Sequence, residues 1–547
     1  MKHAIIKVHP KDNVIVALRK LSKDEKVDLN GEQFTLHETI PAKHKFTVEA
    51  MQPGDPVYMY GVLVAKAKLP IAKAARISTE NVQHASNPYA MHNRKLAWDK
   101  PGVSKWQHTT FMGYQRGDSS AGTANYWLIV PLVFCENRNV EVLREALINK
   151  LGYGRKNKYN SFTKQIISAY KAGGNISEIT LAQSTENASE EKLFKNVDGI
   201  KFLLHDGGCG GTRQDAQALC GLLAGYITHP NVAGATVLSL GCQNSQVSIL
   251  TDEISKRSPN FDKPLYIIEQ QKIGLEKDVM EEAIRKTFEG LVEADKCRRS
   301  PVPLSKLCIG LECGGSDGFS GISANPTLGY VSDMLVTLGG SVILSEFPEL
   351  CGVEQELSDR CVDENTAARF MDLMTRYNNR AKEVGSGFHM NPSPGNIKDG
   401  LITDAIKSAG AAKKGGASPV TDVLDYPEKA TKPGLTLLCT PGNDVESTTA
   451  EVGSGANIVL FTTGLGTPTG NPVAPVIKVS SNTELYNRMT DIIDLNTGTI
   501  IDGEETIQQA AERMLEYIIR VASGEETVAA VRNGQDDFIV WKRGVSL

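Results

Sequence analysis

The sequence predicts an α/β protein in which a small β-rich N-terminal unit precedes two α/β segments with largely parallel sheets. The beginning of the chain contains short strand-like runs separated by turn sequences. From about residue 109, continuous apolar runs of strand length alternate with amphipathic helical patterns, which is typical of a parallel sheet covered on both faces. A chain of 547 residues is also too long for one ordinary core, so two or three domains are expected.

Residues 1–95 are expected to form the β-rich unit. The runs from Val14 to Leu18 and from Phe46 to Ala50 have the length and composition of strands. The dipeptide Asn30-Gly31 and the sequence Pro53-Gly54-Asp55-Pro56 are turn signals. The region from Ser86 to His108 has little periodicity and is the expected linker.

The first α/β segment is expected over residues 105–430. Ala216, Leu219, Cys220 and Leu223 share one helical face, as do the apolar residues between 284 and 292. The glycine- and alanine-rich run from 408 to 417 is interpreted as a loop between the two halves. The expected strands are Trp127 to Phe134, Ile200 to Leu204, Ala235 to Leu240, Leu265 to Ile268, Leu307 to Leu311 and Val342 to Leu344.

The second α/β segment is expected over residues 433–547. Its strands are Leu435 to Leu438, Ile458 to Thr462 and Val476 to Val479. A final helix is expected from Glu505 to Ala522, with Gly524 as its stop signal.

Composition and charge exclude several classes of protein. A net charge of -5 and a pI of about 6.1 leave no basic excess for nucleic acid. The apolar run near the N-terminus is too short for a signal or membrane segment, so we expect no membrane association and a cytoplasmic location. The ten cysteines are scattered without a CxxC pair, which favours reduced thiols. A homodimer is expected on base rates alone.

Polar and metal-competent side chains follow the predicted strands, where α/β proteins place their ligand sites. Glycines beside them allow backbone amides to approach an anionic ligand. The loops are HDGGCGG with His205 and Cys209, GCQN with Cys242 and Asn244, ECGGSDG with Glu312, Cys313 and Asp317, SEFPE with Glu346 and Glu349, CTPGND with Cys439, Asn443 and Asp444, and TGLGTPTGNP with Thr467 and Asn471.

Each loop also has a structural interpretation. His205 at a strand end is equally consistent with a hydrogen-bonded structural role. Cys209, Cys242 and Cys313, taken singly, fit small residues at tight turns. The glycine-rich loop at 463–472 lacks the lysine of a phosphate-binding GxxxxGK[ST] loop, and GGCGG lacks the GxGxxG spacing, so nucleotide cofactors are not expected.

The motifs HDGGCGG, LSLGCQN, GLECGGSDGFSGISANPTLG, NPSPGN, TPGND and FTTGLGTPTGNPVAP together resemble the altronate/galactarate dehydratase family. The N-terminal unit resembles the small SAF-type β-clip module of these enzymes, with PAKHKF as its marker. The resemblance covers almost the whole chain. It implies a hydro-lyase that uses divalent iron or manganese to remove water from a sugar acid. The sequence more closely resembles enzymes that convert altronate to 2-dehydro-3-deoxygluconate in galacturonate breakdown. Galactarate or another such acid is the alternative substrate.

Dehydration requires stabilisation of an enediolate-like charge and protonation of a departing hydroxyl group. A divalent metal serves the first purpose, and general acid and base groups serve the second. Iron accepts imidazole, thiolate and carboxylate ligands together. The hypothesis assigns catalysis to His205, Glu312 and Asp317, metal binding to His205, Cys209, Cys242, Cys313 and His44, and substrate binding to Asn244, Asn443, Asp444, Thr467 and Asn471, with His84 as a further lid candidate.

Two other functions stay open at this point. The cysteines after strands could hold an iron–sulfur cluster, although they lack the short spacings common in cluster proteins. The chain could also bind a sugar acid without converting it.

Overall fold

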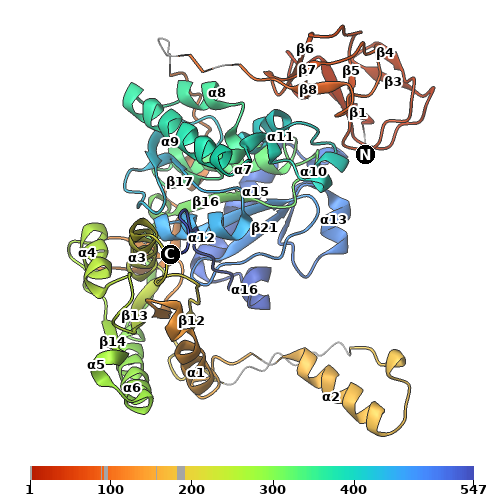
Figure 1. The fold of residues 1–547 in the computed structure, drawn as a ribbon. Coiled ribbons are helices and arrows are strands. Elements are labelled where there is room, and N and C mark those ends of the chain that lie inside the picture. Colours follow the sequence, from red (N-terminus) through yellow and green to blue (C-terminus); the bar gives the residue numbers. More distant parts are fainter. Residues whose placement is uncertain (1–2, 88, 91–95, 156, 182–190) are drawn as a thin grey trace.

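A computed structural model describes residues 3–87, 89–90, 96–155, 157–181 and 191–547. Its N-terminal module, strands β1 to β8, consists of short antiparallel strands (Figure 1). β3 and β4 are joined at Asn30 and Gly31, whose φ angles of 55° and 91° suit a type I′ hairpin and confirm the predicted turn. The strands are β1 (Ile5–Ile6), β2 (Val14–Ala17), β3 (Lys26–Leu29), β4 (Glu32–Thr35), β5 (Lys45–Thr47), β6 (Pro56–Met59), β7 (Val62–Ala67) and β8 (Val82–His84).

A parallel sheet in the order β12-β11-β13-β14 forms the first α/β unit. Alternate residues of β11 face opposite layers: Trp127 packs with helices α1 and α6, whereas Leu128 packs with α3 and α4. All four strands overlap the apolar runs predicted for them. The elements are β11 (Tyr126–Pro131), β12 (Gly199–Phe202), β13 (Val232–Ser239), β14 (Leu265–Glu269), α1 (Asn137–Leu147), α3 (Arg213–Thr228), α4 (Val247–Arg257), α5 (Gln270–Ile273) and α6 (Glu276–Ala294).

A second parallel sheet, in the order β18-β19-β17-β16-β20-β21-β22, forms the other α/β unit. Its strands are β16 (Cys308–Cys313), β17 (Ser341–Leu344), β18 (Val420–Leu424), β19 (Gly434–Leu438), β20 (Ile458–Thr463), β21 (Val476–Ser480) and β22 (Leu495–Asn496).

The expected division of the chain between residues 430 and 433 does not follow these sheets. β16 pairs with β20 and β17 pairs with β19, so strands on both sides of residue 433 share one sheet. Apolar strand sequences carry no information about which strand pairs with which, so a break in the sequence pattern need not coincide with a domain boundary. The two α/β units instead separate before β16.

The helices of the second unit connect it to its neighbours. α7 packs against α15, and α12 packs against β16 and β20 and also against α3 of the first unit. The helices are α7 (Ala324–Thr337), α8 (Glu354–Asp359), α9 (Glu364–Glu383), α10 (Pro394–Lys398), α11 (Asp404–Ala411), α12 (Asp444–Ser454), α13 (Thr483–Arg488), α14 (Gly498–Asp502), α15 (Ile507–Ser523) and α16 (Ala529–Asn533).

The run from 408 to 417, expected to be a loop between halves, is instead largely buried. It begins within α11 and continues in the short 3-10 helix η7 (Ala412–Gly415). Glycines on both sides allow this close packing: a Cβ at Gly416 would lie 2.4 Å from the Gly329 carbonyl oxygen of α7, and one at Gly329 would lie 2.1 Å from the Lys413 carbonyl oxygen. The expected C-terminal helix is confirmed as α15, which a Thr506–Gln509 capping box starts and Gly524 in the left-handed conformation ends.

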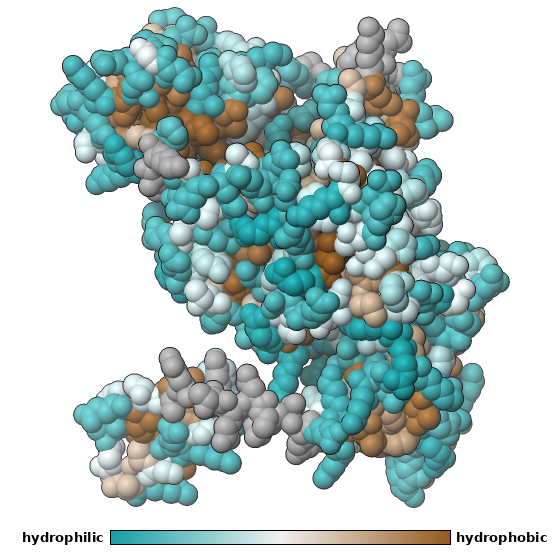
Figure 2. All heavy atoms as spheres, turned by 180° about the vertical axis from the view of Figure 1, so that it is seen from behind, coloured by the Kyte–Doolittle hydropathy of each residue, from teal (hydrophilic) through white to brown (hydrophobic). Residues whose placement is uncertain are grey.

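Two remaining features complete the fold. A small antiparallel sheet combines β9 (Thr110–Gln115) and β10 (Ala121–Gly122), which precede the first α/β unit in the sequence, with β15 (Arg299–Pro303), which lies between the two units. Helix α2 (Lys158–Lys171) stands away from the body of the protein in both views (Figure 1, Figure 2). No helix in the described ranges is both long and apolar enough to cross a membrane.

The contact between α3 and α12 predicts a steric test of how the α/β units join. A Cβ at Gly225 would lie 2.1 Å from the Gly453 carbonyl oxygen, so Gly225→Ala must push two helix backbones apart. We expect it to destabilise the fold by about 1–3 kcal/mol, measured as a lower denaturation midpoint. Gly102→Ala, at a site with no atom within 4 Å, is the matched control. Equal midpoints for the two variants would contradict this packing.

Candidate active site

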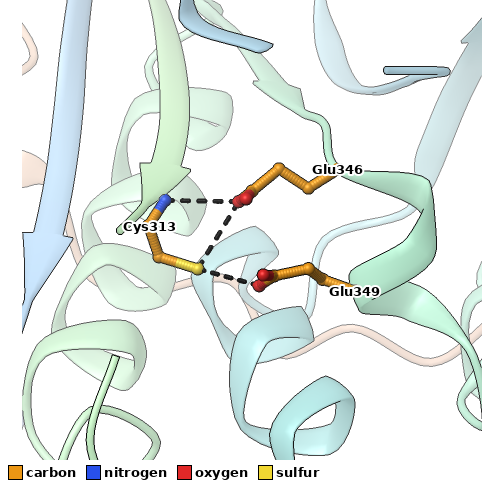
Figure 3. A group of neighbouring side chains, drawn as sticks. All are labelled: Cys313, Glu346 and Glu349. Carbon is orange, nitrogen blue, oxygen red and sulfur yellow. Dashed lines mark hydrogen bonds between the residues drawn. The ribbon is translucent and has the colours of Figure 1, made fainter. Parts of the chain in front are cut away.

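Cys313, Glu346 and Glu349 meet at the carboxyl ends of two neighbouring strands (Figure 3). Cys313 ends β16, and both glutamates follow β17 around the short 3-10 helix η5 (Phe347–Leu350). The Cys313 Sγ lies 3.0 Å from Glu349 Oε2 and 3.4 Å from Glu346 Oε2. Within the part of the chain that the structure describes, these three residues form the one group of potential metal-ligating side chains whose ligand atoms all lie within 4.8 Å of one another.

The backbone at Glu346 is held in a conformation that is unfavourable for a residue with a side chain. Its φ of 62° and ψ of 59° are left-handed, which costs about 1–2 kcal/mol for a non-glycine residue. Thr440 at the end of β19 holds the turn, since its Oγ1 accepts a 2.8 Å hydrogen bond from the Glu346 N–H. Such strain collects at functional sites, where it aims a side chain.

Two buried lysines neutralise the glutamates. Lys414 Nζ lies 2.6 Å from Glu346 Oε2, and Lys407 Nζ lies 2.6 Å from Glu349 Oε1 and donates to Asn391 Oδ1. Burial alone would lower the pKa of each lysine, but the surrounding thiol and carboxylates outweigh it and raise the pKa values of both. Burial also acts on Glu349, yet the two ammonium groups hold its pKa below the ordinary value.

Two further glutamates lie beside this group without a lysine of their own. Burial, together with Glu346 and Glu451, raises the pKa of Glu312 well above its ordinary value. Burial raises the pKa of Glu451 to about 8. The Ser345 hydroxyl lies between them, 3.4 Å from Glu312 Oε2 and 2.7 Å from Glu451 Oε1. Burial therefore favours the protonated form of both carboxyl groups, while the two lysines pair with Glu346 and Glu349.

Asp444 stands at the more open side of the cluster. It begins α12 and is half-buried, and its Oδ2 lies so close to Gly314 that a Cβ there would approach it to 2.0 Å. Burial, with the Glu346 and Glu349 carboxylates, raises the pKa of Asp444 to about 7. A carboxyl group that titrates near neutral pH can accept and return a proton during a reaction.

The cysteines and histidine of the first α/β unit do not join this cluster. Both ring nitrogens of His205 are occupied by backbone: Nε2 lies 2.7 Å from the Pro131 oxygen, and Nδ1 accepts from the Gly207 N–H. This leaves His205 no free lone pair for a metal, and the structural role is the one observed. Cys209 and Cys242 are exposed.

The HDGGCGG and GCQN loops nevertheless meet, as the sequence predicts for loops at one sheet edge. The Gly208 oxygen accepts from the Asn244 N–H at 2.8 Å, and Cys209 and Asn244 line a small cleft covered by residues 540–542. The first turn of α12 lies between this group and the buried cluster. Burial and the Asp206 carboxylate raise the pKa of Glu446 in that turn, whereas burial and the Glu346 carboxylate raise the pKa of Asp444.

Asp317 and His44, assigned to catalysis and metal binding, lie at the contact with the N-terminal module. The Asp317 carboxylate is fully buried and accepts hydrogen bonds from the Ser320 and Ser481 hydroxyl groups and from the Asn482 amide. His44 Nε2 lies 3.0 Å from the Lys398 oxygen. These hydrogen bonds give Asp317 a structural function. Neither Asp317 nor His44 belongs to the Cys313 group.

Of the residues assigned to substrate binding, some lie near the loop that follows Cys313 and others hold local structure. Asn443 caps α12, where its Oδ1 accepts from two backbone N–H groups, and Asn471 is buried and bonded to Tyr226 and to backbone. Thr467 is half-buried beside Gly315. Asp444 and Thr467 thus remain near the loop that follows Cys313, while both asparagines hold local structure.

Sequence reasoning placed Glu346 and Glu349 after a strand but assigned them no role, and it missed Lys407 and Lys414 altogether. The signal for the glutamates is present in SEFPE, two carboxylates at the carboxyl end of a buried strand. The lysines carried a weaker signal: both stand among alanines and glycines that permit deep burial.

A separate cleft of about 1030 Å³ lies between β12 and the segment that follows α15. Five cationic side chains line it, but Lys201 is paired with Asp536 at 2.7 Å and Arg299 donates to three backbone carbonyl groups. It borders the start of β11 and the whole of β12 in the first α/β unit, whereas the candidate active site lies at the carboxyl ends of two strands in the second unit.

Three family models match successive parts of the chain. They describe an altronate/galactarate dehydratase SAF domain (residues 3–85), a D-galactarate dehydratase/altronate hydrolase second domain (residues 113–295) and a D-galactarate/altronate dehydratase C-terminal domain (residues 304–546). The last two meet where the two parallel sheets separate.

Curated relatives match over almost the full length. The chain is 33% identical to altronate dehydratase of Bacillus subtilis strain 168 over 547 residues, covering 100% of both chains. It is 32% identical to altronate dehydratase of Escherichia coli K12 over 543 residues, covering 99% of both. It is 30% identical to the L-threo-forming galactarate dehydratase of Escherichia coli K12, covering 95% of this chain and 93% of the relative.

The fold and these matches define an enzyme of the carbon–oxygen lyase class, a hydro-lyase that dehydrates a sugar acid. The chain belongs to the altronate/galactarate dehydratase family, and its N-terminal module is the SAF domain of that family.

The charge balance of the cluster predicts that two substitutions destabilise the fold to very different extents. Lys414→Met leaves the Glu346 carboxylate buried without its ammonium partner, which should cost about 3–5 kcal/mol. Glu312→Gln replaces a protonated carboxyl group by a neutral amide of the same shape and should cost far less. Urea denaturation compares them, with Lys432→Met, which breaks an ion pair whose lysine is largely exposed, as the control. A Lys414→Met variant as stable as the control would refute the ion pair.

Proposed function

We propose that the enzyme dehydrates D-altronate to 2-dehydro-3-deoxy-D-gluconate in galacturonate breakdown, and that divalent iron or manganese is its cofactor. The buried thiol, carboxylate and ammonium cluster at the carboxyl ends of β16 and β17 carries this proposal. Two altronate dehydratases that match over 99% or more of the chain support altronate as the substrate. Galactarate is the second candidate, because a galactarate dehydratase matches at 30% identity.

The donor atoms fit a divalent transition metal. Cys313, Glu346 and Glu349 supply one sulfur and two carboxylate groups within 4.8 Å, and the buried Glu346 Oε1 has no hydrogen-bond partner. Iron accepts thiolate and carboxylate ligands together, and the two carboxylates suit manganese. When bound, such an ion supplies Lewis acidity that stabilises charge on the substrate carboxylate.

The chain's own residues account for binding and proton movement. Lys407, which already binds a carboxylate at its Nζ, is suited to bind the substrate carboxylate as well. Asp444, at the open side, takes the proton from C2 onto its carboxylate. The same carboxyl group then returns that proton to the hydroxyl leaving C3, so that one water is released and the enol product rearranges to the 2-keto acid.

Metal and substrate are tested together in an anaerobic assay of the full chain with added iron or manganese. We expect 2-keto product from altronate, and loss of both product and bound metal in Cys313→Ser and Glu349→Gln. Cys209→Ser and Cys242→Ser, which change exposed thiols outside the cluster, should keep both. No product from altronate or galactarate would overturn the proposal, and stoichiometric acid-labile sulfide would favour an iron–sulfur cluster instead.

The raised pKa of Asp444 predicts the pH dependence of the reaction. Because only the ionised carboxylate accepts a proton, kcat/KM should rise with pH as Asp444 ionises, and burial places that rise above the ordinary range of an aspartate pKa. Asp444→Asn should lower kcat/KM by about 100-fold or more and remove this limb of the profile. Asn443→Ser, which preserves the helix cap next to it, is the control. An unchanged limb in Asp444→Asn would exclude Asp444 as the base.

A further inference from the structure

The N-terminal module contacts the core at two places, and each contact involves a segment that carries a residue of the candidate active site. The first contact is an ion pair: Lys43 Nζ lies 3.0 Å from Asp317 Oδ2 and 3.4 Å from Asp399 Oδ1. Lys43 also lies 5.8 Å from the centre of the Phe319 ring. Asp317 is only four residues beyond Cys313, so this contact holds the loop that continues directly from the cluster.

Asp317 transmits this contact into the loop. Its Oδ1 accepts hydrogen bonds from the Phe319 and Ser320 N–H groups, at 3.1 and 2.9 Å. The loop is bound on its other side to the end of β20, because the Gly314 N–H donates to the Thr462 oxygen and the Gly464 N–H to the Gly315 oxygen. A displacement of Asp317 is therefore passed to the backbone next to Cys313.

The glycines of this loop make room for the module. A Cβ at Gly318 would lie 2.7 Å from the Lys43 carbonyl oxygen, and one at Gly321 would lie 2.4 Å from the Tyr60 hydroxyl oxygen. On the opposing segment, a Cβ at Gly400 would lie 2.5 Å from the same Lys43 oxygen. Because these segments are in such close contact, the distance between the module and the core is fixed.

The second contact holds the helix that carries Lys407. His84 Nδ1 lies 2.5 Å from Asp404 Oδ1, and the Thr403 hydroxyl donates to the Val64 oxygen of β7 at 3.1 Å. Thr403 caps α11 and Asp404 is its first residue. Lys407 follows within the first turn of this helix and binds Glu349. The module thus contacts both the loop after Cys313 and the helix of Lys407.

We propose that Lys43 and His84 are positioning residues of the active site. Through Asp317 and Asp404 they set the position of Cys313 relative to Lys407, although neither touches the cluster. This inference rests on the proposed function, because it assigns the cluster to the reacting centre. Small displacements of catalytic groups affect the transition state more than ground-state binding, so the effect falls on kcat.

The test uses the full chain loaded with manganese and compares Lys43→Met, Lys43→Arg and Lys73→Met. Lys73 is a close match on the same module: it pairs with Glu32 at 2.7 Å and lies 4.9 Å from the Phe34 ring, and both of these partners belong to the module itself. We expect Lys43→Met to lower kcat for altronate by about 10- to 100-fold with little change in KM. Lys43→Arg, which keeps the charge, should restore most of kcat, and Lys73→Met should match the unmodified chain.

Backbone hydrogen exchange gives a second measurement that does not depend on activity. Lys43→Met should speed exchange at the Phe319 and Ser320 amides, whereas His84→Leu should speed exchange within α11 and also lower kcat. Unchanged kcat and exchange in Lys43→Met, or equal losses in Lys73→Met, would overturn the inference. If the unmodified chain converts no sugar acid, the proposed function fails, and the exchange comparison alone decides whether Lys43 positions the loop.

Discussion

The burial of opposite charges at the carboxyl ends of β16 and β17 is the constraint on which the second α/β unit depends. A buried carboxylate without a partner costs several kcal/mol, so each glutamate that stays ionised needs a cation beside it. Lys407 and Lys414 meet that need, and they require α11 and η7 to lie inside the protein. For Glu312 and Glu451, which have no such cation, burial raises the pKa and so favours the neutral form.

The glycine-rich GLECGGSDG motif has two functions, one in the buried cluster and one in the contact with the N-terminal module. Its Cys313 belongs to the buried cluster, and its Gly314 leaves space for Asp444. Its later residues, Asp317 and Gly318, face the N-terminal module. The motif therefore joins the candidate reacting centre to the contact between domains, which explains why carboxylate, thiol and glycines occur within so few residues.

The sequence predicted the layers of the fold well, because strands buried on both faces are continuous apolar runs, as in β11 and β20. It did not predict that β16 and β17 share a sheet with β19 and β20, since pairing depends on contacts between distant segments. The same limit applies to the site. Polar side chains after strands are visible in the sequence, but only packing shows that His205 is engaged by backbone while Glu346 is aimed at Cys313. Lys414 was missed because glycine- and lysine-rich composition usually marks exposed loops.

In the proposed function, Cys313, Glu346 and Glu349 hold the metal. X-ray absorption at the metal edge of the iron- or manganese-loaded chain tests it most directly, because it reports which elements surround the ion. We expect one sulfur neighbour among oxygens, and loss of that sulfur in Cys313→Ser. A first shell without sulfur, with imidazole nitrogens, or with the several sulfurs and the second iron of a cluster would contradict it.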